Sequence, residues 1–150
     1  MNIYPFVTHR IVNWGDMDSL AHVNNAKYFS WFEDARIDLF EKLGMVSLAP
    51  SSTFGPILAY IDCQFIVPVT HPDEVLIGSW VSRIGNTSLQ VDHVVHSQKY
   101  DSAVMASSKS IVVMINYQTS EKLRVPDDLR KTIKQSQEGF DIQRLKQSDN

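Results

Sequence analysis

The sequence predicts an α+β domain in which one long central helix is wrapped by a curved, five-stranded antiparallel sheet. Three observations lead to this prediction. An amphipathic pattern runs from about Asn25 to Leu43, with apolar residues recurring every three or four positions. Four segments after it read as strands, and a further strand-like run, residues 6–14, precedes it. Because one helix covers only one face of such a sheet, the other face requires solvent-tolerant residues or a partner.

The first strand is expected to end at Trp14, and a polar loop then leads into the helix through Asn24 and Asn25. Asn is a strong helix N-cap because its side chain accepts a hydrogen bond from an unpaired backbone N–H. Gly44 supplies the left-handed residue that ends the helix. About nineteen residues form a rod of roughly 28 Å, which suits a helix lying across a whole sheet.

The rest of the chain reads as a loop, four strands and a short helix. Residues 45–56 form a loop rich in Ser, Pro and Gly, which we expect to cover a pocket. The apolar residues of this loop are Met45, Leu48 and Phe54. Strands are predicted at 57–67, 74–84, 88–100 and 103–117, and residues 111–115 are apolar on both faces, as in a central strand or one beneath a subunit interface. A short helix follows from about residue 125 to 139. We expect a single domain over 1–150, with an ordered core at about 6–138 and a loose polar tail.

Composition narrows the classes of function. The net charge of −3 lacks the basic footprint of a nucleic-acid-binding protein. The sequence holds no apolar run of membrane-spanning length, and its first residues lack the pattern of an export signal. Cys63 is the only cysteine, which fits a reducing cytoplasm, and it lies in an apolar strand pattern typical of a buried, inert thiol. We therefore expect a cytoplasmic protein with no nucleic-acid or membrane partner.

The loop before the helix carries the side chains that could take part in catalysis. It places Asp18 and His22 near the helix start, where free N–H groups and the helix dipole favour negative charge. A carboxylate there can act on a carbonyl while backbone donors hold the oxyanion. Asp18 is also of a residue type that often only caps a turn, and Asp16 is expected to bond loop amides. Asp16, Asp18 and His22 lie in one flexible loop with no distant fourth ligand, so we predict neither a metal nor another cofactor.

The segment W-G-D-M-D-S-L-A-H-V-N-N-A-K-Y-F-S-W-F-E-D-A-R, residues 14–36, resembles the hotdog-fold thioesterases, and the 4-hydroxybenzoyl-CoA thioesterase branch is the nearest fit. The resemblance implies that Asp18 is the catalytic carboxylate and that the backbone N–H near Asn25 polarises the thioester carbonyl. Many members have Gly where this chain has Ala21. The family also implies homodimers with sheets joined edge to edge, often paired into homotetramers, and active sites completed by the partner subunit.

The predicted function is therefore acyl-CoA hydrolysis to a free acid and coenzyme A, with Asp18 as nucleophile or general base. His22 is expected to orient Asp18 or to contact substrate, although it can equally be a structural residue. The expected substrate-binding residues lie at the helix start, in the loop after the helix and around a strand turn, where they would meet the acyl group or coenzyme A: Asn24, Tyr28, Phe54, Arg83, Asn86, Thr87 and Ser88.

Several alternatives remain at this stage. Glu33 is a second candidate carboxylate, but a salt bridge to Arg36, three residues on, is the preferred interpretation. A thioesterase acting on acyl-carrier protein fits the same motif. A hydratase acting on enoyl-CoA and a hotdog dimer that binds acyl-CoA without hydrolysing it are the other two possibilities.

Overall fold

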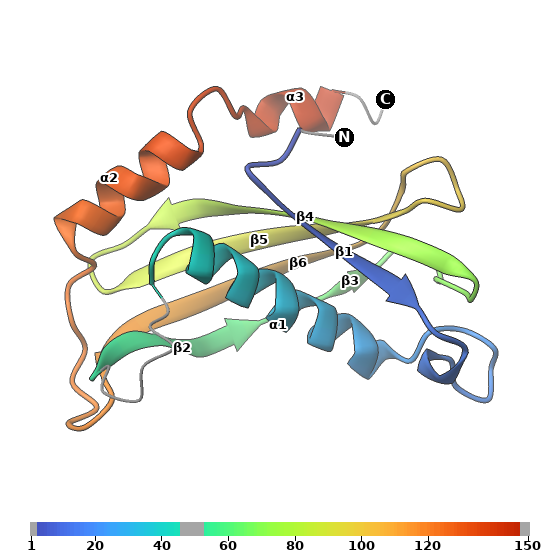
Figure 1. Cartoon of the computed structure of the whole chain (residues 1–150), viewed down its shortest axis with the longest axis horizontal. Coiled ribbons are helices and arrows are strands. Elements are labelled where there is room, and N and C mark those ends of the chain that lie inside the picture. The colour runs from blue at the N-terminus through green and yellow to red at the C-terminus, as the bar shows by residue number, and fades with distance from the viewer. Residues whose placement is uncertain (1–2, 46–52, 148–150) are drawn as a thin grey trace.

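The computed structural model describes residues 3–45 and 53–147. Figure 1 shows one long helix against a strongly bent sheet, with two shorter helices after the last strand. In chain order the elements are β1 (Phe6–Val12), the 3-10 turn η1 (Trp14–Asp16), α1 (Asn25–Lys42), β2 (Phe54–Ile61), β3 (Gln64–Phe65), β4 (Asp73–Ile84), β5 (Ser88–Ser97), β6 (Ala103–Asn116), α2 (Asp127–Ser136) and α3 (Ile142–Gln147).

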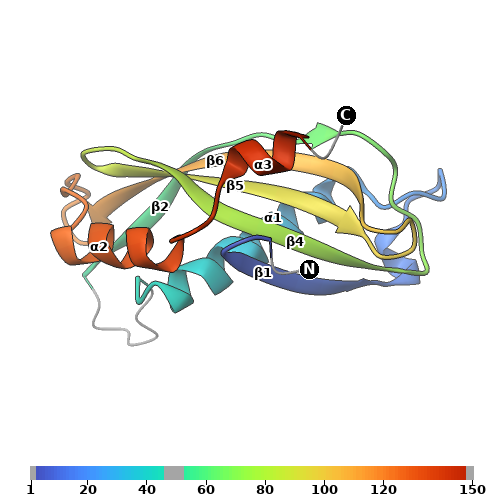
Figure 2. The same ribbon diagram turned by 90° about the horizontal axis from the view of Figure 1, so that it is seen from above.

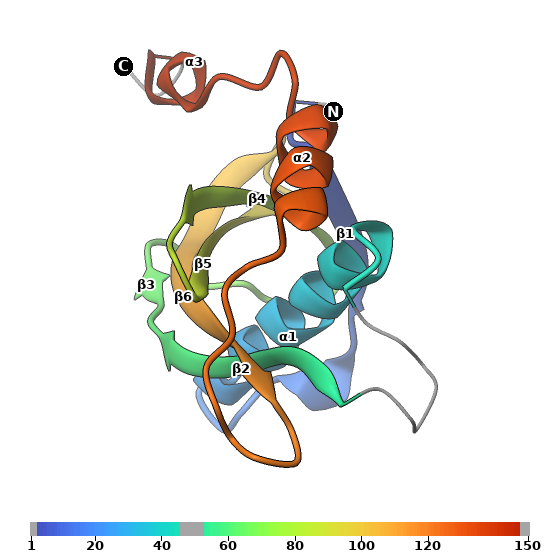
Figure 3. The same cartoon turned by 90° about the vertical axis from the view of Figure 1, so that its left-hand side faces the viewer.

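The sheet is antiparallel and runs in the order β1-β4-β5-β6-β2, with the short β3 also paired to β6. Seen end-on in Figure 3, the strands curve around α1. The helix packs mainly on β1, β4 and β5. This arrangement confirms the predicted α+β architecture of one helix enclosed by a curved antiparallel sheet.

Helix α1 forms where the sequence predicts it. The Asn24 side chain caps it by accepting a hydrogen bond from the Ala26 N–H, and Gly44, at φ 70°, follows its last turn. Its buried face is almost wholly apolar and carries Tyr28, Trp31, Phe32, Ala35, Arg36, Leu39 and Phe40. Arg36 is the exception, since it is charged and only 7% exposed.

The strand predicted at 57–67 differs from the structure. The strand β2 begins earlier, at Phe54, and ends at Ile61, and β3 holds only Gln64 and Phe65. Ile57, which a strict two-residue alternation along 57–67 would place on the buried face with Ile61, is exposed. The reason is that β2 lies at the sheet edge and its register shifts between Leu58 and Tyr60, which breaks the two-residue alternation. Met45 is buried at the end of the helix, whereas Leu48 and most of the predicted loop lie outside the described residues.

The C-terminal segment carries more structure than the sequence predicts. Where a loose tail is expected, α3 lies across the outside of the sheet, on the face opposite α1 (Figure 2). Phe140 and Ile142 pack there against Tyr4 and Trp80. In the described part of the chain, no helix combines the length and apolar character needed to cross a membrane.

Candidate functional site

The loop between β1 and α1 is held by backbone hydrogen bonds. The Asp18 N–H donates to the His22 carbonyl at 2.9 Å, and the Ala21 N–H donates to the Asp18 carbonyl at 3.0 Å. The Asp18 carboxylate accepts the Leu20 N–H through Oδ1 at 2.9 Å, and its residue is exposed in the single chain. Ala21 takes the left-handed φ of 61°, so this chain keeps a glycine-like turn at the cost of some backbone strain.

Asp16 anchors the loop to the helix. Its carboxylate accepts the Asn13 N–H at 2.8 Å and lies 3.4 Å from the Lys27 ammonium. The Asn24 N–H donates to the Asp16 carbonyl. Asn25 is the first residue of α1, so its N–H has no acceptor within the helix and is available to a bound oxygen. These contacts give Asp16 the structural role that the sequence predicts.

A hollow of about 320 Å³ opens beside the first turn of α1. Tyr28 is buried at its base, and its hydroxyl accepts the Val69 N–H at 3.2 Å. Burial raises the pKa of Tyr28, so this hydroxyl stays protonated near neutral pH. Asp18 does not line the hollow within one chain. The lining residues are His22, Val23, Asn25, Tyr28, Phe65, Ile66, Val67 and Pro68.

The other predicted substrate residues lie at the opposite end of the sheet. β1 pairs with β4 so that Val12 faces Asp73, which places the start of α1 near the beginning of β4. Arg83 lies near the far end of β4, Asn86 and Thr87 form the turn after it, and Ser88 begins β5. The turn between β4 and β5 lies at the other end of the sheet from the start of α1 (Figure 1). Phe54 lies at that end too, in a hollow of about 310 Å³ with Met45. A single chain therefore does not bring these residues to Asp18.

A buried polar row crosses the sheet beneath α1, and the sequence analysis missed it. Ser79, His93 and Ser108 are paired neighbours on β4, β5 and β6. The Ser79 hydroxyl lies 2.7 Å from His93 Nδ1, and the Phe32 ring stacks on the imidazole at 5.5 Å. The sequence could have indicated this row through His93, because it alternates with Val91 and Val95 on the face of β5 that the pattern predicts to be buried.

His93 makes the stability of the protein depend on pH. Burial lowers the pKa of His93 to about 3, and the charge of Arg36 acts in the same direction. Below about pH 6.5 the His93 imidazole is therefore protonated in the unfolded chain but stays neutral in the folded protein. The free energy of unfolding falls as pH falls from about 6.5 towards about 3. We expect the free energy of unfolding, measured in urea, to decrease by about 2 kcal/mol from about pH 7 to about pH 5.

The matched variants isolate this effect. His93→Gln should flatten the pH dependence in that range. His9→Gln, at an exposed position on β1 where the imidazole meets only the exposed Glu74 carboxylate, should keep most of it. A slope that is the same in both variants would contradict the assignment to His93.

The structure also bears on the Glu33–Arg36 salt bridge, on the possible metal site and on Cys63. Glu33 is exposed, and among the described residues it forms no ion pair with Arg36, so the predicted salt bridge is wrong. The Arg36 guanidinium is buried, which lowers its pKa, and the Glu33 carboxylate acts on its charge from beyond ion-pair distance. Across residues 3–45 and 53–147, no group of three or more His, Cys, Asp or Glu is placed to hold a metal ion. Cys63 is half-buried, and burial raises its pKa to about 11.

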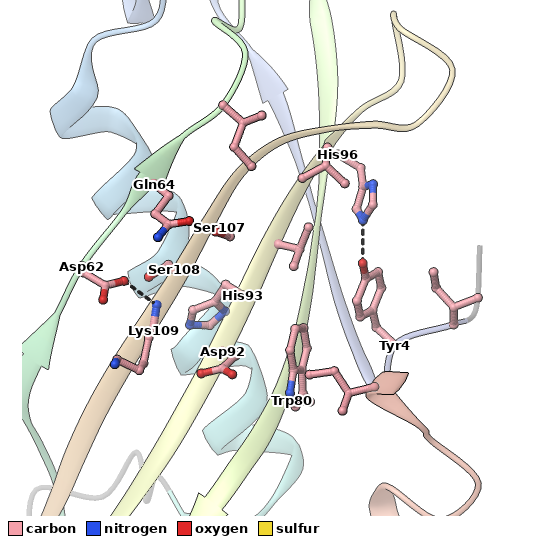
Figure 4. Close-up of a pocket in the computed structure, with 15 residues that line it drawn as sticks. Tyr4, Asp62, Gln64, Trp80, Asp92, His93, His96, Ser107, Ser108 and Lys109 are labelled. Carbon is pink, nitrogen blue, oxygen red and sulfur yellow. Dashed lines mark hydrogen bonds between the residues drawn. The ribbon is translucent and has the colours of Figure 1, made fainter. Parts of the chain in front are cut away.

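A larger hollow, of about 510 Å³, lies on the outer face of the sheet (Figure 4). Trp80, Asp92 and Lys109 face it from three paired strands, and Tyr4, whose hydroxyl lies 2.7 Å from His96 Nε2, borders it. None of the predicted site residues lies in this hollow.

A family model and a known protein both match most of this chain. Residues 12–133 match the model of the thioesterase-like superfamily. The chain is 22% identical over 130 residues to the uncharacterized protein YsmA of Bacillus subtilis, covering 87% of this chain and 86% of that protein.

Two solved structures are similar along almost their whole length. The PA2801 protein of Pseudomonas aeruginosa, provisionally assigned as a thioesterase, is 32% identical, covers 87% of this chain and 98% of its own, and has a TM-score of 0.79. A thioesterase from Thermus thermophilus, solved with coenzyme A and zinc, is 25% identical, covers 91% of this chain and 96% of its own, and has a TM-score of 0.76.

Proposed function

The chain belongs to the thioesterase-like superfamily, and from that premise we propose that it hydrolyses acyl-CoA to a free acid and coenzyme A. The predicted hotdog-type thioesterase family and the thioester hydrolase class are confirmed at this level. The observation that supports acyl-CoA as the substrate is the capped start of α1, which presents a free N–H beside a hollow.

The chemistry assigned to this site needs an oxyanion donor and a carboxylate. The thioester carbonyl oxygen would accept the Asn25 N–H, which lies at the positive end of the α1 dipole. Asp18 would either attack the carbonyl carbon or take a proton from the attacking water, and coenzyme A leaves as the thiol. His22, which borders the hollow and is tied to Asp18 through the backbone, would contact the thioester or orient the carboxylate.

The functional unit in this proposal is a homodimer of single-domain chains. Exposed apolar residues recur along β2, β3 and the segment after them, which we call the β2–β3 edge: Ile57, Leu58, Tyr60, Phe65, Ile66 and Val67. Phe65, Ile66 and Val67 also line the hollow at the start of α1. A partner docked on this edge would enclose the hollow and would bring Asp18 to a covered site.

The same dimer would bring the residues at the far end of β4 close to the site at the start of α1 in the other subunit. Two sheets joined edge to edge in antiparallel fashion place the far end of one chain near the helix start of the other. Arg83, Asn86, Thr87 and Ser88 of one subunit would then meet the pantetheine or phosphates bound at the other. Phe54 of the first subunit and Asn24 and Tyr28 of the second would contact the rest of the substrate. Two dimers would pair into a tetramer through the hollow outer face around Trp80.

A thiol-release assay tests the proposal. The protein is incubated with short, long and aromatic acyl-CoA and with matched acyl-carrier-protein thioesters, and free thiol is measured against spontaneous hydrolysis. We expect turnover on at least one CoA series. Faster turnover on the carrier-protein series would favour the alternative substrate, and tight acyl-CoA binding without thiol release would favour a non-catalytic acyl-CoA-binding dimer.

A further inference from the structure

The Tyr28 hydroxyl keeps an unused hydrogen-bond donor at the base of the hollow beside α1. Its oxygen accepts the Val69 N–H at 3.2 Å, and no acceptor among the described residues takes its proton. Burial raises the pKa of Tyr28, so the proton stays on the oxygen at physiological pH. A phenol in this state can still donate one hydrogen bond to a molecule in the hollow.

The fold holds this hydroxyl near the Asn25 N–H. Side chains of an α-helix lean towards its N-terminus, so Tyr28, three residues after Asn25, lies over the first turn of α1. Its partner Val69 is fixed at the same place, because the Val69 carbonyl accepts the Val23 N–H at 2.9 Å. Since Val23 comes two residues before Asn25, these two hydrogen bonds tie the hydroxyl to the start of the helix.

Tyr28 and Asn25 line the same small hollow. Its volume of about 320 Å³ is roughly ten times the share of one water molecule in the liquid, so a group bound at one of these residues lies close to the other. Apart from His22, Asn25 and Tyr28, the lining residues are apolar. A partner subunit on the β2–β3 edge would exclude water from this hollow, and hydrogen bonds are stronger in such surroundings.

We propose that the Tyr28 hydroxyl is a second hydrogen-bond donor to the thioester carbonyl oxygen, beside the Asn25 N–H. This inference rests on the proposed function and adds a catalytic residue to its site. When the nucleophile attacks, the carbonyl π electrons move onto the oxygen, and both donors stabilise that negative charge. The charge returns to re-form the carbonyl as the C–S bond breaks and the thiolate leaves, so Tyr28 keeps its proton throughout. The Val69 N–H polarises the hydroxyl and strengthens its donation.

Kinetics of Tyr28→Phe give the first test. We expect kcat for acyl-CoA hydrolysis to fall by about a hundredfold and KM to change by less than about threefold, because the hydrogen bond strengthens as charge develops on the oxygen. Tyr117→Phe is the matched control. The Tyr117 hydroxyl also bonds the backbone, donating to the Pro56 carbonyl at 2.7 Å, and its loss should leave kcat unchanged.

Infrared spectroscopy separates a bond to the substrate from a structural role, and it does not depend on turnover. The probes are the ketone analogues of octanoyl-CoA and benzoyl-CoA, in which a methylene replaces the thioester sulfur and the carbonyl carbon is isotope-labelled. Each hydrogen bond to the carbonyl oxygen lowers its stretching frequency. We expect the bound ketone to absorb at a higher frequency in Tyr28→Phe than in the wild type. It should absorb at a lower frequency when Tyr28 is replaced by a fluorotyrosine with the fluorine beside the hydroxyl, which strengthens the donor and keeps the acceptor of the Val69 N–H.

The outcomes distinguish this proposal from the proposed hydrolysis. Equal frequencies in the wild type and the fluorotyrosine protein, or a wild type that binds neither ketone, overturns the role of Tyr28, as does a kcat of Tyr28→Phe within about threefold of the wild type. If Tyr28→Phe does not fold by circular dichroism, the fluorotyrosine protein decides alone. Thiol release by the wild type without these frequency shifts would leave the hydrolysis standing and remove Tyr28 from it. The shifts without thiol release would support the donor and contradict the hydrolysis.

Discussion

Replacing Asp18 by Asn is expected to lower acyl-CoA turnover by about a thousandfold without unfolding the protein. The Asn side chain keeps the oxygen that accepts the Leu20 N–H at 2.9 Å, so the loop geometry survives. It loses the negative charge that either attacks the thioester or activates water. Thiol-release kinetics would give the loss of turnover, and urea unfolding would verify that stability is within about 0.5 kcal/mol of the wild type.

The matched control for this variant is Asp141→Asn. The Asp141 carboxylate accepts the Gln143 N–H at 2.9 Å, which is the same local contact two residues along the chain. Its replacement should leave turnover unchanged. Wild-type turnover in Asp18→Asn would remove Asp18 from the mechanism and turn attention to Glu33.

Leu58→Lys is expected to convert the proposed dimer to monomers and to abolish turnover with them. Leu58 is 43% exposed in the single chain and lies in the middle of the β2–β3 edge. A lysine there would have to bury an unpaired ammonium in the contact between two chains, which costs several kcal/mol. Light scattering on a sizing column would measure the mass, and thiol release would measure the activity.

Ile11→Lys provides the comparison on the opposite edge of the sheet. Ile11 is 71% exposed on β1, so it is an equally apolar edge residue outside the proposed contact. We expect this variant to keep both the dimer and its turnover. A Leu58→Lys protein that remains dimeric and active would show that the subunits meet elsewhere.

The parts of the fold that were predicted correctly depend on local physical rules. The start and end of α1 follow from Asn24 and Gly44, because capping is decided within a few residues of the chain. The interior strands β4, β5 and β6 each have a partner on both edges, and most of β5 keeps the two-residue period of burial. β4 is buried on both faces from Val75 to Val81, because α1 covers one face and the cluster of Tyr4 and Trp80 the other. In β2 the same period failed, since an edge strand with a register shift has no fixed buried face.

The candidate site was predicted only in part for a related reason. The loop of Asp18 and His22 and the helix start at Asn25 are neighbours in sequence, so one motif contains them all. The row of Ser79, His93 and Ser108 is assembled from three strands, and its members become neighbours only through strand pairing. A salt bridge between Glu33 and Arg36 was a reasonable prediction from their spacing, but the packing of α1 against the sheet placed Arg36 inside.

The sequence by itself therefore determined the helix, the succession of strands along the chain and the acidic loop that leads into the helix, because caps, periodicity and turns act over short stretches of chain. Only the tertiary structure decided which groups are buried together under α1, that α3 lies on the outer face, and that Arg83 to Ser88 are far from Asp18 in one chain. Burial and strand pairing join residues that are distant in sequence, and no local pattern records which of them will meet.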